Sequence, residues 1–443
     1  MGLVDEGARM TDIADNSTNR WKKHLDRHAD KRVRTSAANL LLILVNDDKL
    51  AGRILYNLFA DEVVQRGELP WGDFGDAGAP LQDHHAFELA AYLAGPSYKM
   101  NASTRQVHEA VEAAARLWGF HPVRDWLDGL CWDGKRRLHQ LFGSMIGGAD
   151  TPYTETVSLN VLVSAIERAM NPGAKVDNMV VLEGPQGFAK SSMFAALFAP
   201  WCSEAMESPA HKDFYQSLRG KWAVEIAEMD AFSRAEVTQV KRAITTTTDR
   251  YRPSYGRVAR DFARQCIFFG TTNEDRYLRD ATGARRFWPV KCTAKINVDV
   301  IAAQREQLFA EARHLHAKGW QFWQLPPGAE VEQEDRYLQD SWEPVVARWL
   351  DHPPRNTSVA NENIEGHASH TPEPALDVQR DAGGRVVAVA IAEALRFGLG
   401  LDYSRQTRPD QMRVAGILRR LGWDKRRASA AGAGRTYLWE RPA

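Results

Sequence analysis

The N-terminal part of the chain shows apolar residues at helical spacing. Residues 39–64, NLLLILVNDDKLAGRILYNLFADEVV, keep this spacing with one interruption at Asp47 and Asp48. Residues 84–95 and 104–120 show two further amphipathic patterns. These patterns predict one helical domain over residues 36–150, preceded by a polar, disordered arm over residues 1–35.

The middle of the chain combines short apolar runs with amphipathic helices. Apolar runs at 179–182, 222–229 and 266–269 predict buried strands. Helical patterns at 153–170 and 233–246 lie between or before them. We therefore expect an α/β core over residues 151–325, in a chain whose fold class is multidomain α/β.

The C-terminal part is predicted to form a separate basic domain. A helix over 326–350 precedes a Pro-, Asn- and Ser-rich linker over 351–375. Residues 376–443 then read as helix, helix and hairpin, which is the order of a winged helix. From Arg380 onward this part holds 13 Lys or Arg and six Asp or Glu, and the cations expected to contact DNA phosphates are Arg419, Arg420, Lys425, Arg426 and Arg427. Winged helices also dock proteins, so both uses stay open.

Composition adds three limits. Lys plus Arg and Asp plus Glu each number 57 in 443 residues, so any nucleic-acid surface has to be local. The four cysteines lie far apart and predict neither a zinc site nor disulfides. The longest apolar run, residues 40–45, is too short to span a bilayer, and the N-terminus lacks the pattern of a secretory signal. We expect a cytoplasmic protein without a membrane partner.

The strongest chemical motif is residues 178–192, NMVVLEGPQGFAKSS. An apolar strand runs into a glycine-bearing loop, a lysine, hydroxyls and a helix, which is the construction of a P-loop. Backbone N–H groups and the helix N-terminus would hold the phosphates of ATP, Lys190 would reach the β- and γ-phosphates, and Ser191 would hold Mg²⁺. The predicted nucleotide-binding residues are Gly184, Gly187, Ala189, Lys190, Ser191 and Ser192.

Ala189 departs from the motif, which has glycine before the lysine. Alanine is tolerated there if its φ is negative and is strained if its φ is positive. An ordinary Gly-Pro turn that happens to contain a lysine is the alternative interpretation.

Three further groups follow in the order of a P-loop ATPase. Strand alternation places Glu228 and Asp230 on one face, where they would bind Mg²⁺ and polarise water, with Glu225 on the opposite face in a structural role. Asn273 ends the next apolar strand and would orient water or contact the γ-phosphate, although capping a turn is the alternative. Arg285 and Arg286 precede a later strand and would act across a subunit interface, or else form surface salt bridges.

These motifs resemble the virulence-associated protein E family of phage- and mobile-element-encoded ATPases, which is related to superfamily 3 helicases and phage primase-helicases. The resemblance rests on LEGPQGFAKSS, WAVEIAEMDAF, DRYRPSYGR, IFFGTTNED and TGARRFWPV, with upstream phrases such as HPVRDWLDGLCWDGKRRL. It implies an AAA+-like core, hexameric rings and movement on single-stranded DNA, with an element-encoded primase or polymerase as a further partner. By position it assigns Lys241 and the turn from Asp249 to Arg257 to the DNA-facing pore, which includes Arg250, Arg252, Tyr255 and Arg257.

Two functions therefore stay open. The first is an ATP-dependent, ring-forming DNA helicase or translocase that replicates a phage or mobile element. The second is an initiator, regulatory or phage-interference protein that binds ATP and DNA but hydrolyses little ATP, with Ala189 as its sign.

Overall fold

The computed structural model describes most of the 443 residues, and every structural statement below concerns this part of the chain. The described residues are 19–209, 211–229, 234–253, 258–278, 284–338, 340–353, 378–428 and 436–441. The chain divides into two compact units, one formed by residues 1–275 and 285–333 and the other by 276–284 and 334–443. The described residues contain no helix long and apolar enough to cross a membrane.

The N-terminal part of the first unit is a mixed α/β structure, so the prediction of an all-helical domain is wrong. Its four-stranded sheet has the order β5-β2-β1-β6, with β1 pairing antiparallel to β2 and parallel to β6. Helices α2 and α3 pack against α4. The elements are α2 (Ala37–Asn46), β1 (Ile54–Asn57), β2 (Glu62–Gln65), β3 (Glu68–Leu69), β4 (Gly72–Asp73), β5 (Ala79–Pro80), α3 (Asp83–Ala94), α4 (Thr104–Ala115), η2 (Arg116–Trp118) and β6 (Gly119–Phe120).

The long helical pattern at 39–64 breaks because of Asp47. Its backbone N–H closes the end of α2, and its carboxylate accepts hydrogen bonds from Lys49 N and from the hydroxyls of Tyr92 and Tyr98. Gly52 then takes a φ of +69°, a turn conformation that glycine adopts without strain. The apolar residues beyond it therefore continue as two strands rather than one helix.

The predicted disordered arm is partly ordered. Residues 19–24 form a 3-10 helix (η1, Asn19–His24), and Leu25 and Val33 are buried in the same core as α2. The buried amide of Asn39 ties this segment down by bonding the backbone of Asp26 and Arg34. Residues 1–18 lie outside the described part.

The core of the first unit is a five-stranded, fully parallel sheet. Its order is β13-β7-β12-β9-β8, so β12 lies between β7 and β9. The strands are β7 (Met179–Glu183), β8 (Cys202–Glu204), β9 (Ala223–Ile226), β12 (Ile267–Thr272) and β13 (Phe287–Lys291). Nearly continuous apolar runs suit these strands because helices cover both faces of such a sheet.

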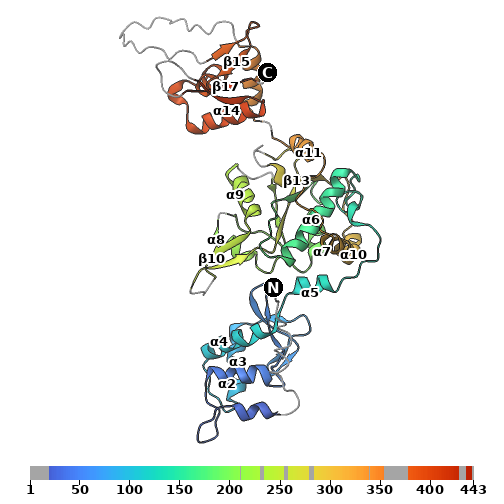
Figure 1. Cartoon of the computed structure of the whole chain (residues 1–443), viewed down its shortest axis with the longest axis vertical. Coiled ribbons are helices and arrows are strands. Elements are labelled where there is room, and N and C mark those ends of the chain that lie inside the picture. The colour runs from blue at the N-terminus through green and yellow to red at the C-terminus, as the bar shows by residue number, and fades with distance from the viewer. Residues whose placement is uncertain are drawn as a thin grey trace, which may run out of the picture. The chain divides into compact units, whose positions relative to one another are not determined.

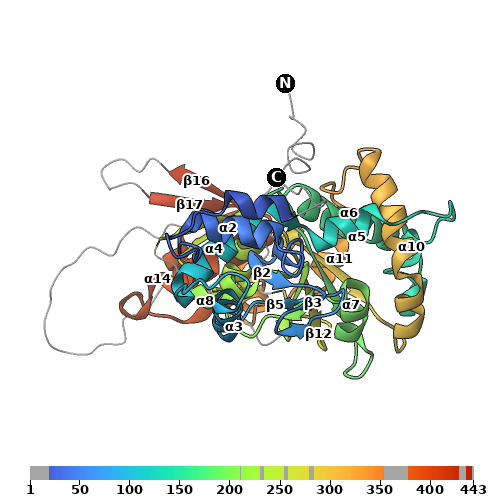
Figure 2. The same cartoon turned by 90° about the horizontal axis from the view of Figure 1, so that it is seen from below.

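Two neighbouring aromatic residues of β12 show how the two faces are covered. Phe269 stacks on Phe194 of α7, and Phe268 stacks on Phe214 of α8. Because successive side chains of a strand point to opposite faces, α7 and α8 lie on opposite sides. Figure 1 shows α6, α7 and α10 together on one side, and Figure 2 shows the same separation from α8. The helices are α6 (Pro152–Met170), α7 (Lys190–Phe198), α8 (Lys212–Ser217), α9 (Arg234–Thr245) and α10 (Val298–Ala317).

Residues 121–150 belong to this core and not to the N-terminal part. Leu127, Leu138 and Phe142 are buried in one cluster with α6, α7 and the sheet. The elements are α5 (Pro122–Asp128), η3 (Leu138–Gln140) and η4 (Ser144–Ile146). The boundary expected at residue 150 therefore lies near residue 120.

A hairpin formed by β10 (Thr248–Tyr251) and β11 (Arg260–Ala263) leads into β12. At its base the guanidinium of Arg264 forms a bidentate ion pair with Asp249, with Nε 3.0 Å from Oδ2, and also bonds the carbonyl of Ala243 in α9. Both side chains of the ion pair are buried. Residues 254–257 of the connecting turn lie outside the described part.

The second unit contains an antiparallel sheet of order β14-β15-β17-β16. The run VVAVA, predicted as the start of a helix, supplies β15 instead, while the later helix and the hairpin lie where they were predicted. The helix expected over 326–350 is two helices, α11 and α12. The elements are α11 (Ala329–Asp335), α12 (Glu343–Asp351), β14 (Val378–Arg380), β15 (Val386–Val389), α13 (Ile391–Glu393), η7 (Ala394–Gly398), η8 (Tyr403–Arg405), α14 (Arg408–Arg420), β16 (Asp424–Ala428) and β17 (Thr436–Glu440). The predicted linker falls mainly on residues 354–377, outside the described part.

The hairpin base gives a stability prediction. Asp249→Ala leaves the buried Arg264 guanidinium without its carboxylate, which costs about 3–5 kcal/mol of unfolding free energy. The matched control is Asp261→Ala, which removes the exposed partner of Arg250 on the same hairpin and costs at most about 1 kcal/mol. Chemical denaturation followed by tryptophan fluorescence measures both, and equal losses would contradict the structural role of the buried pair.

Candidate active site

The loop of residues 184–189 joins β7 to α7 at the carboxyl edge of the parallel sheet. Ligands of open α/β sheets bind outside this edge, where neighbouring connections leave in opposite directions. Here the chain leaves β7 toward β8 and β9 and later crosses back to β13 on the other side of β7. The candidate site is therefore centred on the end of β7.

Two glycines permit the path of this loop. Gly184 has a φ of +147°, and a Cβ there would lie 2.9 Å from the carbonyl oxygen of Cys292. Gly187 has a φ of +85° with open space around it. A side chain is excluded at the first position by contact and disfavoured at the second by backbone conformation.

Ala189 occupies the left-handed region, with φ +63° and ψ +31°, directly before α7. The positive-φ alternative considered from the sequence is therefore the one found, and the methyl group adds strain. In the described chain, the backbone N–H groups of Gly187, Ala189, Ser191 and Ser192 donate to no backbone carbonyl. Donors at a helix N-terminus suit an anion such as phosphate.

Lys190 is buried beneath the loop. Its Nζ donates to the carbonyl oxygens of Gly184 at 2.5 Å and Pro185 at 3.1 Å, and to Oδ1 of Asn273 at 3.0 Å. The structure thus brings together the lysine and the asparagine that the sequence places 83 residues apart. The ammonium lies within the loop, where it adds positive charge to the N–H groups.

Glu225 is the residue that sequence reasoning missed. This buried side chain of β9 accepts hydrogen bonds at Oε1 from Ser191 Oγ and from Thr271 Oγ1, both at 2.7 Å. The expected contrast with Glu228 fails because β9 ends at Ile226, so that Glu228, with a φ of +51°, is not part of the strand. A carboxylate inside such an apolar run was the available signal, since a buried charge requires partners.

The hydroxyl and carboxylate pair fits a divalent cation. Mg²⁺ prefers oxygen ligands and is held through one or two protein groups together with phosphates. Ser191 and Glu225 supply hard oxygen atoms next to the loop donors. The residues present therefore fit a magnesium nucleotide.

The other predicted carboxylates follow β9. Glu228 is exposed, has a φ of +51°, and lines a cavity of about 370 Å³ with Glu204, Glu207 and Glu236. Asp230 lies outside the described residues, so its predicted role stays a prediction.

Arg285 and Arg286 lie at the opposite edge of the sheet from the loop. They precede β13, whose first residue, Phe287, pairs with Met179 at the start of β7. The loop begins after Glu183, four residues further along β7, or about 13 Å at 3.3 Å per residue. These arginines therefore do not reach the loop of their own chain, and Arg286 Nε is buried without a hydrogen-bond partner in the described structure.

The predicted DNA-contact residues divide by exposure. Lys241 and Asp249 are buried, and Asp249 is occupied by Arg264, whereas Arg250 and Arg252 are exposed. Tyr255 and Arg257 lie outside the described part.

The predicted cations of the second unit divide by whether they form ion pairs. Arg420 is paired with Glu343 at 2.7 Å, and Arg426 pairs with Glu440 at 3.1 Å. Arg419, Lys425 and Arg427 are exposed, and alternation along β16 places Lys425 and Arg427 on one face.

Residues 127–341 match the family model described as the virulence-associated protein E-like domain. No curated protein matches the sequence. Among solved structures, the chain matches an apo structure of the NrS-1 C-terminal region, at 11% identity and a TM-score of 0.45, covering 88% of this chain and 96% of that one. An A-form apo structure of the same region gives 11% identity, a TM-score of 0.44 and coverage of 87% and 96%. The part of the chain that contains the parallel sheet is a virulence-associated protein E-like domain, as its motifs predicted.

Glycine substitutions at Ala189 and at a second alanine of the same loop–helix segment should change the unfolding free energy in opposite directions. Ala189→Gly removes the left-handed strain and should raise the unfolding free energy by about 1 kcal/mol. Ala195→Gly, at an exposed position within the same helix, should lower it by about 1 kcal/mol. Thermal and denaturant unfolding measure both changes, and two losses of equal size would show that Ala189 is unstrained.

Proposed function

We propose that this protein is an ATP-dependent, ring-forming DNA helicase or translocase that acts in the replication of a phage or mobile genetic element. The observation that carries the proposal is the pair of contacts at the carboxyl edge of the sheet, Lys190 with Asn273 and Ser191 with Glu225. They join a loop of N–H donors, a cation, an amide and a buried carboxylate in the arrangement that phosphoryl transfer needs. The virulence-associated protein E-like domain supports the link with mobile elements.

Each residue has a stated task in this proposal. When bound, Mg²⁺-ATP supplies the phosphoryl group that water attacks. The loop N–H groups and Lys190 hold the phosphate charge, and the hydroxyl of Ser191 together with Glu225 holds the cation. Asn273 orients Lys190 through the contact between them, and Glu228 accepts the proton of the attacking water from its exposed position.

The placement of the paired arginines supports the proposed assembly into a ring. Arg285 and Arg286 lie at the edge of the sheet away from their own loop, so stabilising charge at a loop requires a neighbouring copy. We therefore assign them to the subunit interface of a hexamer. DNA contacts are assigned to the exposed Arg250 and Arg252 of the hairpin and to Arg419, Lys425 and Arg427 of the second unit, which we regard as a winged-helix-like domain.

The alternative function is an ATP-binding initiator or regulatory protein with little hydrolysis. Ala189 favours it, because a strained methyl group occupies the position before Lys190. In that case the basic second unit would recognise DNA, and nucleotide binding would set the state of the protein.

Steady-state ATP hydrolysis with and without single-stranded DNA tests the motor. We expect hydrolysis that rises with DNA and disappears in Lys190→Ala, because this variant loses the cation beneath the loop. Wild-type protein that binds ATP without hydrolysing it would instead establish the switch.

The two carboxylates give a sharper comparison. Glu225→Gln weakens the Mg²⁺-dependent binding of ATP, since its carboxylate meets Ser191. Glu228→Gln keeps binding and lowers kcat by about 10²–10⁴-fold, the contribution of a general base. Isothermal titration with a non-hydrolysable ATP analogue, combined with turnover measurements, separates the effects. Equal losses of binding in both variants would contradict the separate roles.

A further inference from the structure

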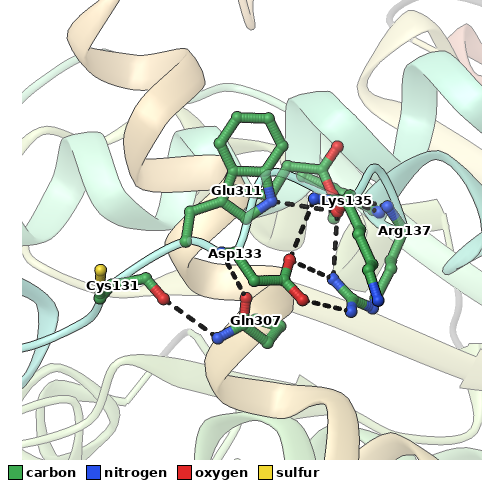
Figure 3. A network of polar contacts seen from close by, with 8 residues as sticks. Cys131, Asp133, Lys135, Arg137, Gln307 and Glu311 are labelled. Atoms are coloured by element: carbon green, nitrogen blue, oxygen red, sulfur yellow. Dashed lines mark hydrogen bonds and ion pairs between the residues drawn. The ribbon is translucent and has the colours of Figure 1, made fainter.

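A second group of cations lies outside the candidate active site, on the turn formed by residues 131–138, CWDGKRRL. Figure 3 shows this 131–138 turn together with the helix α10 side chains that hold it. Its sequence carries part of the resemblance to the virulence-associated protein E family. Nothing in the proposed nucleotide chemistry requires it.

Two side chains of α10 fix the backbone of the turn. Gln307 Nε2 donates to the carbonyl of Cys131 at 3.1 Å, and its Oε1 accepts from Asp133 N at 3.0 Å. The buried Glu311 accepts at Oε2 from the backbone N–H groups of Arg137 at 2.7 Å and Leu138 at 2.9 Å. The turn is therefore anchored at both ends.

Contacts within the turn complete its shape. Arg137 forms a bidentate ion pair with Asp133 at 2.6 and 2.7 Å, and Asp133 also accepts from Lys135 N. The indole N–H of Trp132 donates to the carbonyl of Lys135, while its ring lies 4.6 Å from that of His314. The hydrogen bonds from the Arg137 guanidinium and from Lys135 N hold the pKa of Asp133 well below its usual value. The carboxylate is therefore charged, and Arg137 balances its charge within the turn.

Two cations are left over. Lys135 and Arg136 are both exposed, and neither forms an ion pair in the described structure. The acid nearest in sequence, Asp133, is already engaged by Arg137. Because the hydrogen bonds from α10 fix the backbone of the turn, an anion that binds the two cations pays for ordering their side chains but not the backbone.

The anion is not the nucleotide of the same chain. Ile296, just before α10, bonds the carbonyl of Phe188 in the 184–189 loop, so α10 begins beside that loop. Gln307 and Glu311 lie nine and 13 residues beyond Val298, which is about 14–20 Å along the helix. The 131–138 turn therefore faces another ligand.

We propose that the 131–138 turn binds the phosphate backbone of single-stranded DNA through Lys135 and Arg136. The inference rests on the proposed function for its ligand and adds a contact outside the hairpin and the second unit. Two cations beside an aromatic ring match the combination with which proteins hold single strands, positive charge for phosphates and π surface for bases. The half-buried Trp132 supplies that surface.

Equilibrium binding of a fluorescent oligothymidylate at several salt concentrations, without nucleotide, tests the proposal. The double variant Lys135→Ala/Arg136→Ala should bind on the order of tenfold more weakly at 0.1 M salt, and its salt slope should be about 1.4 smaller in magnitude. Its unfolding midpoint should be unchanged because both side chains are exposed. The charge-conserving Lys135→Arg/Arg136→Lys variant should restore binding.

The matched control is Arg20→Ala/Lys49→Ala, which removes two exposed cations from the N-terminal part. Affinity and salt slope equal to those of this control would overturn the proposal. Retained DNA affinity with lower DNA-free ATP hydrolysis would also overturn it, in favour of contact with a second copy of the chain. A wild type without ATP hydrolysis whose DNA binding still depends on the two cations would remove the proposed motor and leave this site in place.

Discussion

The position of strand β12 is the constraint on which the candidate site depends. It pairs in parallel with β7 on one side and β9 on the other, with Thr272 opposite Glu183 and Gly270 opposite Ile226. Three distant segments consequently end at one edge, where Asn273 meets Lys190 and where Thr271 shares Glu225 with Ser191. A Cβ at Gly270 would lie 3.1 Å from the Met179 side chain and 3.2 Å from that of Met229, so a larger residue there would require both methionines to shift. The hairpin joins the start of the same strand, so the candidate nucleotide-binding end of the sheet and the candidate DNA hairpin share β12.

Backbone strain is concentrated at the same edge. Ala189 and Glu228 are two of the few residues other than glycine with positive φ, and they follow β7 and β9. Such conformations cost about 1–3 kcal/mol each and persist only where surrounding structure fixes them. Here the buried sheet and the packing of Phe194 on Phe269 supply that support. The strain therefore lies at the candidate site, where the proposed motor and the alternative switch differ.

Local patterns predicted the elements whose signals lie within a few residues. The run before Gly184, the lysine and the helix after it form one contiguous motif, and β7 and α7 lie where it places them. The failures have tertiary causes. Residues 54–64 look helical by period, yet the partners of Asp47 end the helix early. Residues 386–389, VVAV, form a strand because they pair with β14 and β17. The pairing with β17 joins residues about 50 positions apart, which a local pattern does not reveal. Glu225 was assigned only a structural role because Glu228 and Asp230 were expected to continue the strand, whereas β9 ends at Ile226.

The neutral net charge of the chain is compatible with binding to DNA if cations gather locally, and several acids are paired with arginines of the same chain. Ion pairs join Asp249 to Arg264, Asp133 to Arg137 and Glu343 to Arg420. Each pair fixes a hairpin, a turn or a helix contact. In each pair the arginine also neutralises a carboxylate that would otherwise repel a polyanion. The exposed cations that remain include two local groups, Lys135 and Arg136 on one turn and Lys425 and Arg427 on one strand face. Because screening limits such charges to about 8–10 Å, their local grouping and not the total charge determines where a polyanion binds.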